Sequence, residues 1–265
     1  MKNNSVDIYF FTGTGNSYLA AKRVAKVLEQ NGCGVNLLDL AKSEPEKADL
    51  SKTIGIFFPV ACWNTYPLVR NFIKKLPKAA GTEVFVCSTM GGSSMKAAAN
   101  IGSILSRKGY SVIASKGFVM PNNFIAVKSE EKNAAIREKA YTKMESFALD
   151  IVNGAAKPES TNIFFELSFL FTSFITGLWE SGFSQKIMKF NLIKEHCTKC
   201  GLCADICPVK NISMADYPAF DGNKCQFCMR CISYCPSNAI SKIYINKTYR
   251  ALDAGEMKEC FQKKY

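Results

Sequence analysis

The sequence predicts an α/β fold, a doubly wound five-stranded parallel sheet, followed by a small α+β domain organised around metal. Five strand-like runs alternate with helical patterns up to about residue 155, and this alternation is typical of a doubly wound sheet. Two cysteine-rich runs of identical spacing follow, between residues 197 and 236. A very apolar stretch within residues 160–190 separates the two patterns.

Most predicted strands of the sheet lead into a helical pattern. The strands are predicted at residues 6–11, 34–40, 52–61, 82–89 and 111–120, and the helices at 16–32, 66–76, 94–109 and 128–153. Ligands of such sheets bind beyond the carboxyl ends of the strands. Three loops, residues 12–17, 59–66 and 88–94, should therefore lie together and form a binding site.

Eight of the twelve cysteines form two copies of the spacing C-x2-C-x2-C-x3-C-P, so that each member of the first copy recurs in the second at one constant offset. A structural zinc site takes four ligands in pairs and has no use for a third close cysteine and a proline. In bacterial ferredoxins with this run, the fourth cysteine ligates the other of two [4Fe–4S] clusters. We therefore expect one cluster on Cys197, Cys200, Cys203 and Cys235, and the other on Cys225, Cys228, Cys231 and Cys207. Residues 191–245 resemble a two-cluster bacterial ferredoxin.

The remaining cysteines and the single histidine carry less information. Clustered cysteines favour metal binding in a reducing cytoplasm over a disulfide scaffold. Cys33, Cys62 and Cys87 are predicted to be small apolar core residues. Cys260 is predicted to be a spare thiol in a polar C-terminal tail, and His196 a surface group beside a ligand.

The loop "TGTGNS" has the composition of a phosphate-binding turn. It lacks the lysine of a Walker loop, and Tyr18 stands where a Rossmann fingerprint has its third glycine. Hydroxyls, an amide and the N–H groups of a helix start can bind a terminal phosphate without a cation. A tight turn without ligand is the alternative. The loop is similar to the phosphate loop of the flavodoxin family, [ST]-x-T-G-N-[ST], and this resemblance, over residues 1 to about 155, implies a flavodoxin-like fold and FMN. The residues implied in this loop are Thr12, Gly13, Thr14, Gly15, Asn16 and Ser17.

The two other loops supply candidate contacts to the flavin ring. Trp63 and Tyr66 could cover a flat ring, or they could merely cap the sheet. Small residues and N–H groups of the third loop could meet the polar edge of the flavin, with Met90 as an apolar cover. The candidate FMN-binding residues here are Pro59, Val60, Ala61, Trp63, Asn64 and Tyr66, and Ser88, Thr89, Met90, Gly91 and Gly92.

The apolar stretch shows helical spacing in Leu167, Leu170, Phe171, Phe174 and Leu178. We expect it to pack between the two domains or against a partner subunit, as in a homodimer. A weak contact with a membrane surface is the alternative, although the polar face lacks lysines. A transmembrane span is not expected, because the run is at the lower limit of the length needed.

The whole chain resembles flavodoxin–ferredoxin fusions of anaerobic bacteria and archaea. The expected parts are an FMN-binding flavodoxin-like domain (1–157), an apolar helical connector (158–190), a two-cluster ferredoxin domain (191–245) and a C-terminal tail (246–265). The resemblance implies a cytoplasmic electron carrier that passes electrons between FMN, the two clusters and external redox partners. The alternative is a flavin-dependent reductase of a small molecule, fed through the clusters. No set of catalytic acid and base residues is evident near the flavin loops, which favours the carrier.

The formal net charge of +12 overstates the charge of the loaded protein. Two clusters with their thiolates remove about four units, and a flavin phosphate removes roughly two more. The remainder is mildly basic, and no arginine-rich tract or nucleic-acid motif accompanies it. We expect acidic redox proteins, such as acidic ferredoxins, as partners and do not expect nucleic acid.

Overall fold

The computed structural model describes residues 1, 3–123, 127–177, 190–221, 224–242 and 249–261. Its N-terminal domain is built on a five-stranded parallel sheet in the order β2-β1-β3-β4-β5. The strands are β1 (Ser5–Phe10), β2 (Gly34–Asp39), β3 (Thr53–Pro59), β4 (Glu83–Met90) and β5 (Ser111–Val119). This is the flavodoxin-like strand order, which confirms the fold class predicted from the sequence.

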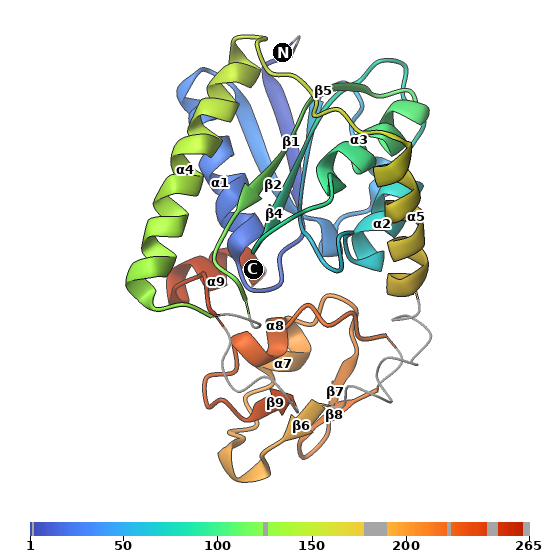
Figure 1. Ribbon diagram of the computed structural model, residues 1–265. Helices are drawn as coiled ribbons and strands as arrows, with labels where there is room; N and C mark the ends of the chain where they lie inside the picture. Colours follow the sequence, from blue (N-terminus) through green and yellow to red (C-terminus); the bar gives the residue numbers. More distant parts are fainter. Residues whose placement is uncertain (2, 124–126, 178–189, 222–223, 243–248, 262–265) are drawn as a thin grey trace.

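Four helices cover the two faces of this sheet (Figure 1). Helices α1 (Asn16–Gln30) and α4 (Glu130–Val152) lie together on one face, and α2 (Pro67–Lys75) and α3 (Ala97–Arg107) cover the other. β3 is buried along almost its whole length because it is covered on both faces. Short 3-10 helices occur at Leu40–Lys42, Pro45–Lys47 and Lys194–His196.

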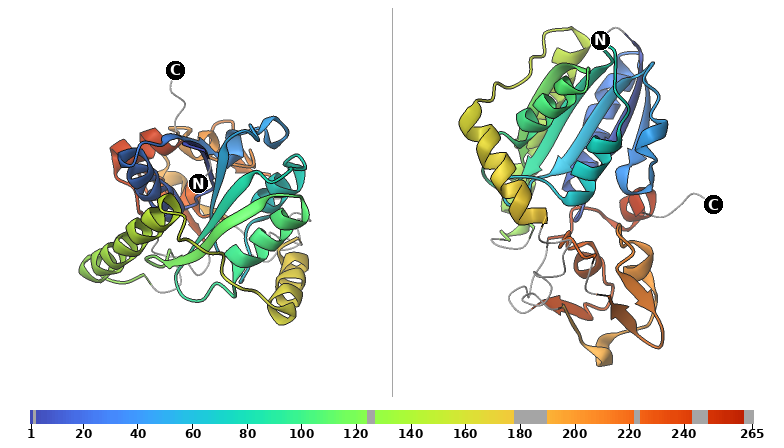
Figure 2. Two further views of the ribbon diagram at one scale, coloured as in Figure 1. Left: turned by 90° about the horizontal axis from the view of Figure 1, so that it is seen from above. Right: turned by 90° about the vertical axis from the view of Figure 1, so that its right-hand side faces the viewer.

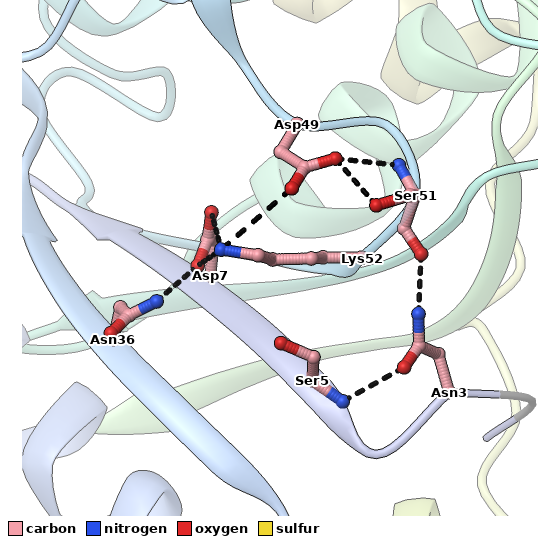
Figure 3. Close-up of polar contacts among 7 residues, drawn as sticks. All are labelled: Asn3, Ser5, Asp7, Asn36, Asp49, Ser51 and Lys52. Carbon is pink, nitrogen blue, oxygen red and sulfur yellow. Dashed lines mark hydrogen bonds and ion pairs between the residues drawn. The ribbon is translucent and has the colours of Figure 1, made fainter.

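An ion-paired cluster closes the sheet at the amino ends of its strands (Figure 3). Asp7 of β1 is buried, and its carboxylate accepts hydrogen bonds from Lys52 Nζ at 3.1 and 3.2 Å and from Asn36 Nδ2 at 2.7 Å. Asp49 and Ser51 hold the neighbouring turn through hydrogen bonds of 2.6 and 3.0 Å. The buried carboxylate is thus fully partnered, which is the condition for burying a charge.

The C-terminal domain (described residues 190–221 and 224–242) contains two copies of one unit. Its elements are β6 (Phe190–Leu192), α7 (Leu202–Asp205), β7 (Ile212–Met214), β8 (Pro218–Phe220), α8 (Arg230–Ser233) and β9 (Ile240–Lys242). β8, α8 and β9 follow β6, α7 and β7 at the same interval that separates the two cysteine runs. β6 pairs with β9 and β7 with β8, both antiparallel, so strands of one copy pair with strands of the other.

This small domain lies below the carboxyl ends of the parallel strands (Figures 1 and 2). Its cysteine-bearing segments face the loop after β1 so closely that a Cβ added to Gly13 would lie 2.1 Å from the carbonyl oxygen of Cys228. The two predicted domains are therefore in direct contact, at the end of the sheet where ligands bind.

Helix α5 (Ile163–Gly177) lies in the predicted connector, but its orientation differs from the prediction. It packs along α2 and α3 of the N-terminal domain (Figure 1). Its apolar residues Leu167, Leu170, Phe171 and Phe174 are 57% to 69% exposed, whereas Phe169, Thr172 and Thr176 are buried. The prediction that the broad apolar face would pack between the domains is therefore wrong for the described residues. Leu178 and the rest of 178–189 lie outside them.

The predicted C-terminal tail is also not a tail over its described part. Residues 249–253 run back to the loop after β1, and α9 (Ala254–Phe261) packs on the N-terminal domain beside α1 (Figure 1). Cys260 is 4% exposed in the same apolar core as α1. The prediction of a spare thiol in a polar tail is therefore wrong for Cys260, which is a core residue like Cys33 and Cys87. Residues 246–248 and 262–265 lie outside the described part of the chain.

Candidate functional site

A cavity of about 390 Å³ opens between the carboxyl ends of the strands and the C-terminal domain. Three predicted loops contribute to it, and so do the segment after β5 and two residues beside Cys228. Its lining consists of Thr12, Gly13, Thr14, Asn16, Ser17, Pro59, Val60, Ala61, Cys62, Tyr66, Thr89, Met90, Gly91, Pro121, Asn122, Asn123, Phe227 and Met229. None of these lining residues carries a formal charge.

The loop after β1 has the local structure of an anion-binding turn. Gly15 has a φ of 109°, which favours glycine, and it caps the start of α1. Its N–H donates to Thr12 Oγ1 at 3.0 Å, and Ser17 Oγ lies 2.7 Å from Thr89 Oγ1 across the neighbouring loop. The first N–H groups of α1 have no partner within the helix, as at any helix start. The positive end of the helix dipole therefore faces the cavity.

Buried polar atoms without a partner remain at this loop. Thr14 Oγ1, Asn16 Oδ1 and, on β4, Ser88 Oγ are buried and make no hydrogen bond in the structure. Asn16 Nδ2 donates to Pro121 O at 2.9 Å and Asn123 Oδ1 at 3.0 Å, which fixes the side chain. Leaving such atoms unpaired is costly, so Thr14 and Asn16, which line the cavity, fit a bound polar group better than an empty turn.

Four of the predicted flavin contacts do not line the cavity. Trp63 is 58% exposed, and it shares with Cys62 a tight turn with positive φ at both residues, closed by hydrogen bonds between Ala61 and Asn64. The Asn64 amide is buried and points to α5, donating to Phe169 O at 2.8 Å and Ser173 Oγ at 2.8 Å. The other two are Ser88 and Gly92. Gly15 also does not line the cavity, although it shapes the loop.

Tyr66 does line the cavity and is held rigidly. Its ring packs edge-on against Phe11 at 5.3 Å. Burial raises the pKa of its hydroxyl, and the nearby cysteines Cys228, Cys62 and Cys225 raise it further. Burial also raises the pKa of the Cys62 thiol. Both groups therefore stay neutral near pH 7.

Six further residues of the lining were not predicted as contacts. Pro121, Asn122 and Asn123 follow β5, and the rule that ligands bind at carboxyl ends of strands could have pointed to them. Phe227 and Met229 come from the C-terminal domain, and nothing local in the sequence relates them to this cavity. Cys62, in the predicted loop 59–66, lines the cavity too, and it is exposed, so its prediction as a core residue is wrong.

Each set of four cysteines surrounds its own small cavity in the C-terminal domain. One cavity is lined by Cys197, Cys200, Cys203 and Cys235, the other by Cys207, Cys225, Cys228 and Cys231. In each set the fourth cysteine comes from the opposite run. Among the described residues, no three of His, Cys, Asp and Glu lie close enough to hold a single metal ion. His196 is exposed and lines neither cavity.

The backbone of the two cysteine runs is the same at equivalent positions. Lys199 and Phe227 occupy one such pair of positions and have φ values of 58° and 55°, and Gly201 and Met229 occupy another and have 75° and 64°. These left-handed residues wind each loop tightly around its cavity. Backbone N–H groups also point to sulfur: Asn211 N lies 3.2 Å from Cys207 Sγ and Ala239 N 3.2 Å from Cys235 Sγ. Such hydrogen bonds stabilise thiolate ligands.

Burial disfavours charge on these thiols in the absence of a cation. It raises the pKa of Cys203 to about 11, with additional repulsion from Cys200 and Cys235. It raises the pKa of Cys231 well above its ordinary value, with Cys228, Cys225 and Cys207 adding to the effect. Ligands must be deprotonated to bind metal, so a bound cationic group would have to supply the positive charge that offsets these thiolates.

The comparison with protein families decides what the cysteines form. Residues 196–239 match the 4Fe–4S dicluster domain family. They form a 4Fe–4S dicluster domain. The chain thus joins a flavodoxin-like domain to a dicluster domain, as predicted from the sequence, and the prediction of 4Fe–4S clusters is confirmed.

Solved structures of flavodoxins are similar to the N-terminal domain. The flavodoxin of Streptococcus pneumoniae TIGR4 is 16% identical, with 56% of this chain and 98% of that chain covered and a TM-score of 0.45. The Megasphaera elsdenii flavodoxin is 19% identical, with 52% and 98% covered and a TM-score of 0.40. Rubredoxin oxygen:oxidoreductase from Desulfovibrio gigas is 14% identical, with 58% and 36% covered and a TM-score of 0.41. A search among curated proteins finds none that matches the chain.

In the described part of the chain, no helix has the length and apolar character needed to cross a membrane.

Proposed function

We propose that this protein carries electrons between an FMN in the 390 Å³ cavity and two [4Fe–4S] clusters, and exchanges them with external redox proteins in anaerobic metabolism. The observation that carries this proposal is that residues 227–229 contribute to two cavities. Phe227 and Met229 line the cavity proposed for FMN, while Cys228 lines a cysteine cavity. A flavin exchanges one or two electrons and a cubane usually one, so contact between the two sites gives the protein both kinds of exchange.

The fit of FMN to the cavity rests on the loop after β1. Thr12, Thr14, Asn16 and Ser17 would hold the phosphate, together with the N–H groups at the start of α1. The unpartnered Thr14 Oγ1 and Asn16 Oδ1 lie in this loop. Tyr66 and Met90 would contact the ring system, together with Phe227 and Met229 of the dicluster domain.

We propose that the four cysteines around each cavity are the ligands of one cluster. The inner cluster, on Cys207, Cys225, Cys228 and Cys231, would lie beside the FMN cavity. The outer cluster, on Cys197, Cys200, Cys203 and Cys235, includes the exposed Cys200 and would be the exchange point for partners. The cofactors would thus stand in the order FMN, inner cluster, outer cluster.

The alternative, reduction of a small molecule at the flavin, is less well supported. No described residue that lines the cavity is a carboxylate, histidine, lysine or arginine. A reductase that delivers protons with electrons usually positions such a group near the substrate. The neutral lining therefore favours the carrier, and we propose a cytoplasmic location for it, since clustered thiolates need a reducing compartment.

The exposed apolar face of α5 supports a further contact, either with a second copy of the chain or, weakly, with a membrane surface. Large exposed patches of apolar residues mark such contacts. Sedimentation of the loaded protein distinguishes a homodimer from a monomer, and flotation with vesicles of neutral lipid detects membrane contact.

Cofactor analysis of anaerobically purified protein tests the proposal. We expect about eight irons, eight sulfides and one FMN per chain. About four irons, or FAD in place of FMN, would contradict it.

A further inference from the structure

Arg230 is a buried arginine that begins α8, directly between the phosphate loop and the inner-cluster cysteines. It is 2% exposed. Its Nε and Nη2 donate to the carbonyl oxygen of Thr12 at 3.2 and 2.6 Å, and its Nη1 donates to Ile206 O at 3.1 Å. The guanidinium lies against the Phe261 ring at 4.4 Å, and Asp39 Oδ2 is 4.0 Å from Nη1. Arginine is rarely buried unless paired, so this placement is specific.

Tyr234, one helical turn later, makes a second contact of the same kind. It is buried, and its hydroxyl donates to the carbonyl oxygen of Thr14 at 2.7 Å. Residues four apart on a helix lie on one face. Arg230 and Tyr234 therefore present two donors side by side to two carbonyls of the phosphate loop.

The duplication within the dicluster domain shows that cluster binding does not require either residue. The equivalent positions of the first cysteine run hold Leu202 and Ile206. The two runs share their cysteines, their proline and their backbone conformation. At these two positions the first run has aliphatic side chains. The second run, which faces the phosphate loop, has side chains that donate hydrogen bonds.

The two contacts fix the direction of peptide groups in the loop. A peptide is planar and trans, so its N–H points opposite to its carbonyl. Holding Thr12 O toward Arg230 turns the N–H of Gly13 away from the dicluster domain. Holding Thr14 O toward Tyr234 turns the N–H of Gly15 toward Thr12 Oγ1, its observed partner.

Arg230 also places a positive charge next to the phosphate loop, which contains no charged residue. No described residue lining the cavity is charged, yet a flavin phosphate brings about two negative charges. Arg230 itself is buried, so water screens its charge only weakly, and Asp39 Oδ2 at 4.0 Å from Nη1 offsets part of that charge.

We propose that Arg230 and Tyr234 are positioning residues through which the dicluster domain holds the phosphate loop in its binding form, so that recognition of the FMN phosphate depends on the domain that carries the clusters. This rests on the proposed function. Because coupling between sites is reciprocal, bound FMN should in turn slow the release of iron from the inner cluster.

The test compares FMN with riboflavin, which lacks the phosphate, on full-length protein that holds its clusters and has been freed of flavin. Dissociation constants are measured by flavin fluorescence for wild type, Arg230→Gln and Tyr234→Phe. Matched controls away from the site are Arg23→Gln, whose guanidinium pairs with Glu145 of α4, and Tyr110→Phe, a buried residue whose hydroxyl donates to Pro77 O.

We expect the FMN dissociation constant to rise about tenfold or more in Arg230→Gln, the range typical of a lost charge-assisted bond. A smaller rise is expected in Tyr234→Phe. Riboflavin affinity should stay within about twofold in both, and the controls should bind both flavins like wild type. FMN should slow iron release to a chelator in wild type and less so in Arg230→Gln.

An equal weakening of FMN and riboflavin, or no weakening of FMN, would overturn the inference. If Arg230→Gln does not retain its clusters, Tyr234→Phe decides, since it removes a single hydroxyl. Failure of wild type to bind FMN would instead overturn the proposed function, and the inference with it.

Discussion

At the scale of single residues, the eight cysteines are the part of the site that the sequence specifies best. Their spacing determines the loop, and the left-handed residues between them, such as Phe227 and Met229, wind it around its cavity. The fourth cysteine of each run then lies beside the three cysteines of the other run. If each set of four holds one cluster, the fourth cysteine of each run belongs to the cluster of the other run. A domain in which each run holds its own cluster would not have this property.

Paired serine variants test which cysteines share a cluster. Cys207→Ser combined with Cys228→Ser should remove only the inner cluster and leave about four irons per chain. Cys207→Ser combined with Cys200→Ser should damage both clusters, because the two cysteines belong to different sets. Iron analysis and electron paramagnetic resonance of the reduced protein give the count. The opposite pattern would mean that each run holds its own cluster.

The loops around the cavity show which residue positions a local pattern can predict and which it cannot. Thr12 to Ser17 could be predicted because a phosphate loop is local: one turn and one helix start bring the groups together. Trp63 and Asn64 were assigned by residue type alone, and the tight turn at Cys62 sends one outward and the other to α5. Phe227 and Met229 reach the cavity only through the docking of two domains, which no local pattern encodes.

At the scale of elements, the predictions for α5 and for the C-terminal segment are wrong for the same reason: both rest on whether the segment is apolar or polar. The apolar residues of α5 predict that its apolar face is buried, but a network of hydrogen bonds determines its orientation. Arg70 Nη1 donates to Thr176 Oγ1 at 2.7 Å, and Asn64 binds Phe169 O and Ser173. Burying these partnered groups avoids the cost of leaving them unpaired, so the large apolar side chains face outward. The strands and helices of the sheet, by contrast, were predicted well, because the spacing of the apolar residues in each element is compatible with only one buried face.

Charge substitutions on α5 test its orientation. Leu170→Asp with Phe174→Asp should change stability by only about 0.5 kcal/mol, because both side chains are exposed. Electron exchange between FMN and the clusters should be unaffected, as measured by rapid mixing. Phe169→Asp is the matched control, and burial of Phe169 predicts severe destabilisation. Loss of electron exchange in the double variant would show that this face does dock the dicluster domain.

The polar composition of the C-terminal segment predicts a tail, yet its described part packs against the loop after β1. Ala251 N donates to Thr14 O at 3.0 Å and Tyr249 N to Asn123 O at 2.9 Å. Leu252 packs over Gly15, where an added Cβ would lie 2.5 Å from Leu252 Cγ. Residues 249–252, near the end of the described chain, thus pack against the loop after β1 and the segment after β5.

Leu252→Ala should lower the stability of the loaded protein by about 2–5 kcal/mol, the usual cost of truncating a buried leucine. It should also weaken FMN binding, because the loop loses its cover. Thermal unfolding under anaerobic conditions and flavin titration measure the two effects. Leu149→Ala, at a 43% exposed leucine of α4, should behave like wild type. Wild-type stability in Leu252→Ala would mean that the segment is not held in solution.

At the scale of the whole molecule, the charge that remains after the cofactors are counted should guide partners. From a formal +12, the loaded protein remains basic, and long-range attraction steers oppositely charged proteins together. Reduction by an acidic ferredoxin should therefore slow as salt rises past about 0.1 M, where the screening length is about 10 Å. Stopped-flow measurement over a salt series checks this. A rate that does not depend on salt would mean that the basic residues do not face the partner.

Joining both domains in one chain keeps the FMN cavity and the inner-cluster cysteines in contact at any protein concentration. The central claim is that electrons pass between them within one molecule. The most direct test reduces the anaerobic, fully loaded protein with less than one equivalent of a one-electron donor and follows the flavin and cluster absorption bands separately. We predict that redistribution between the bands proceeds at the same rate over at least a tenfold range of protein concentration, roughly 1–10 μM. A rate that rises in proportion to protein concentration would contradict the account.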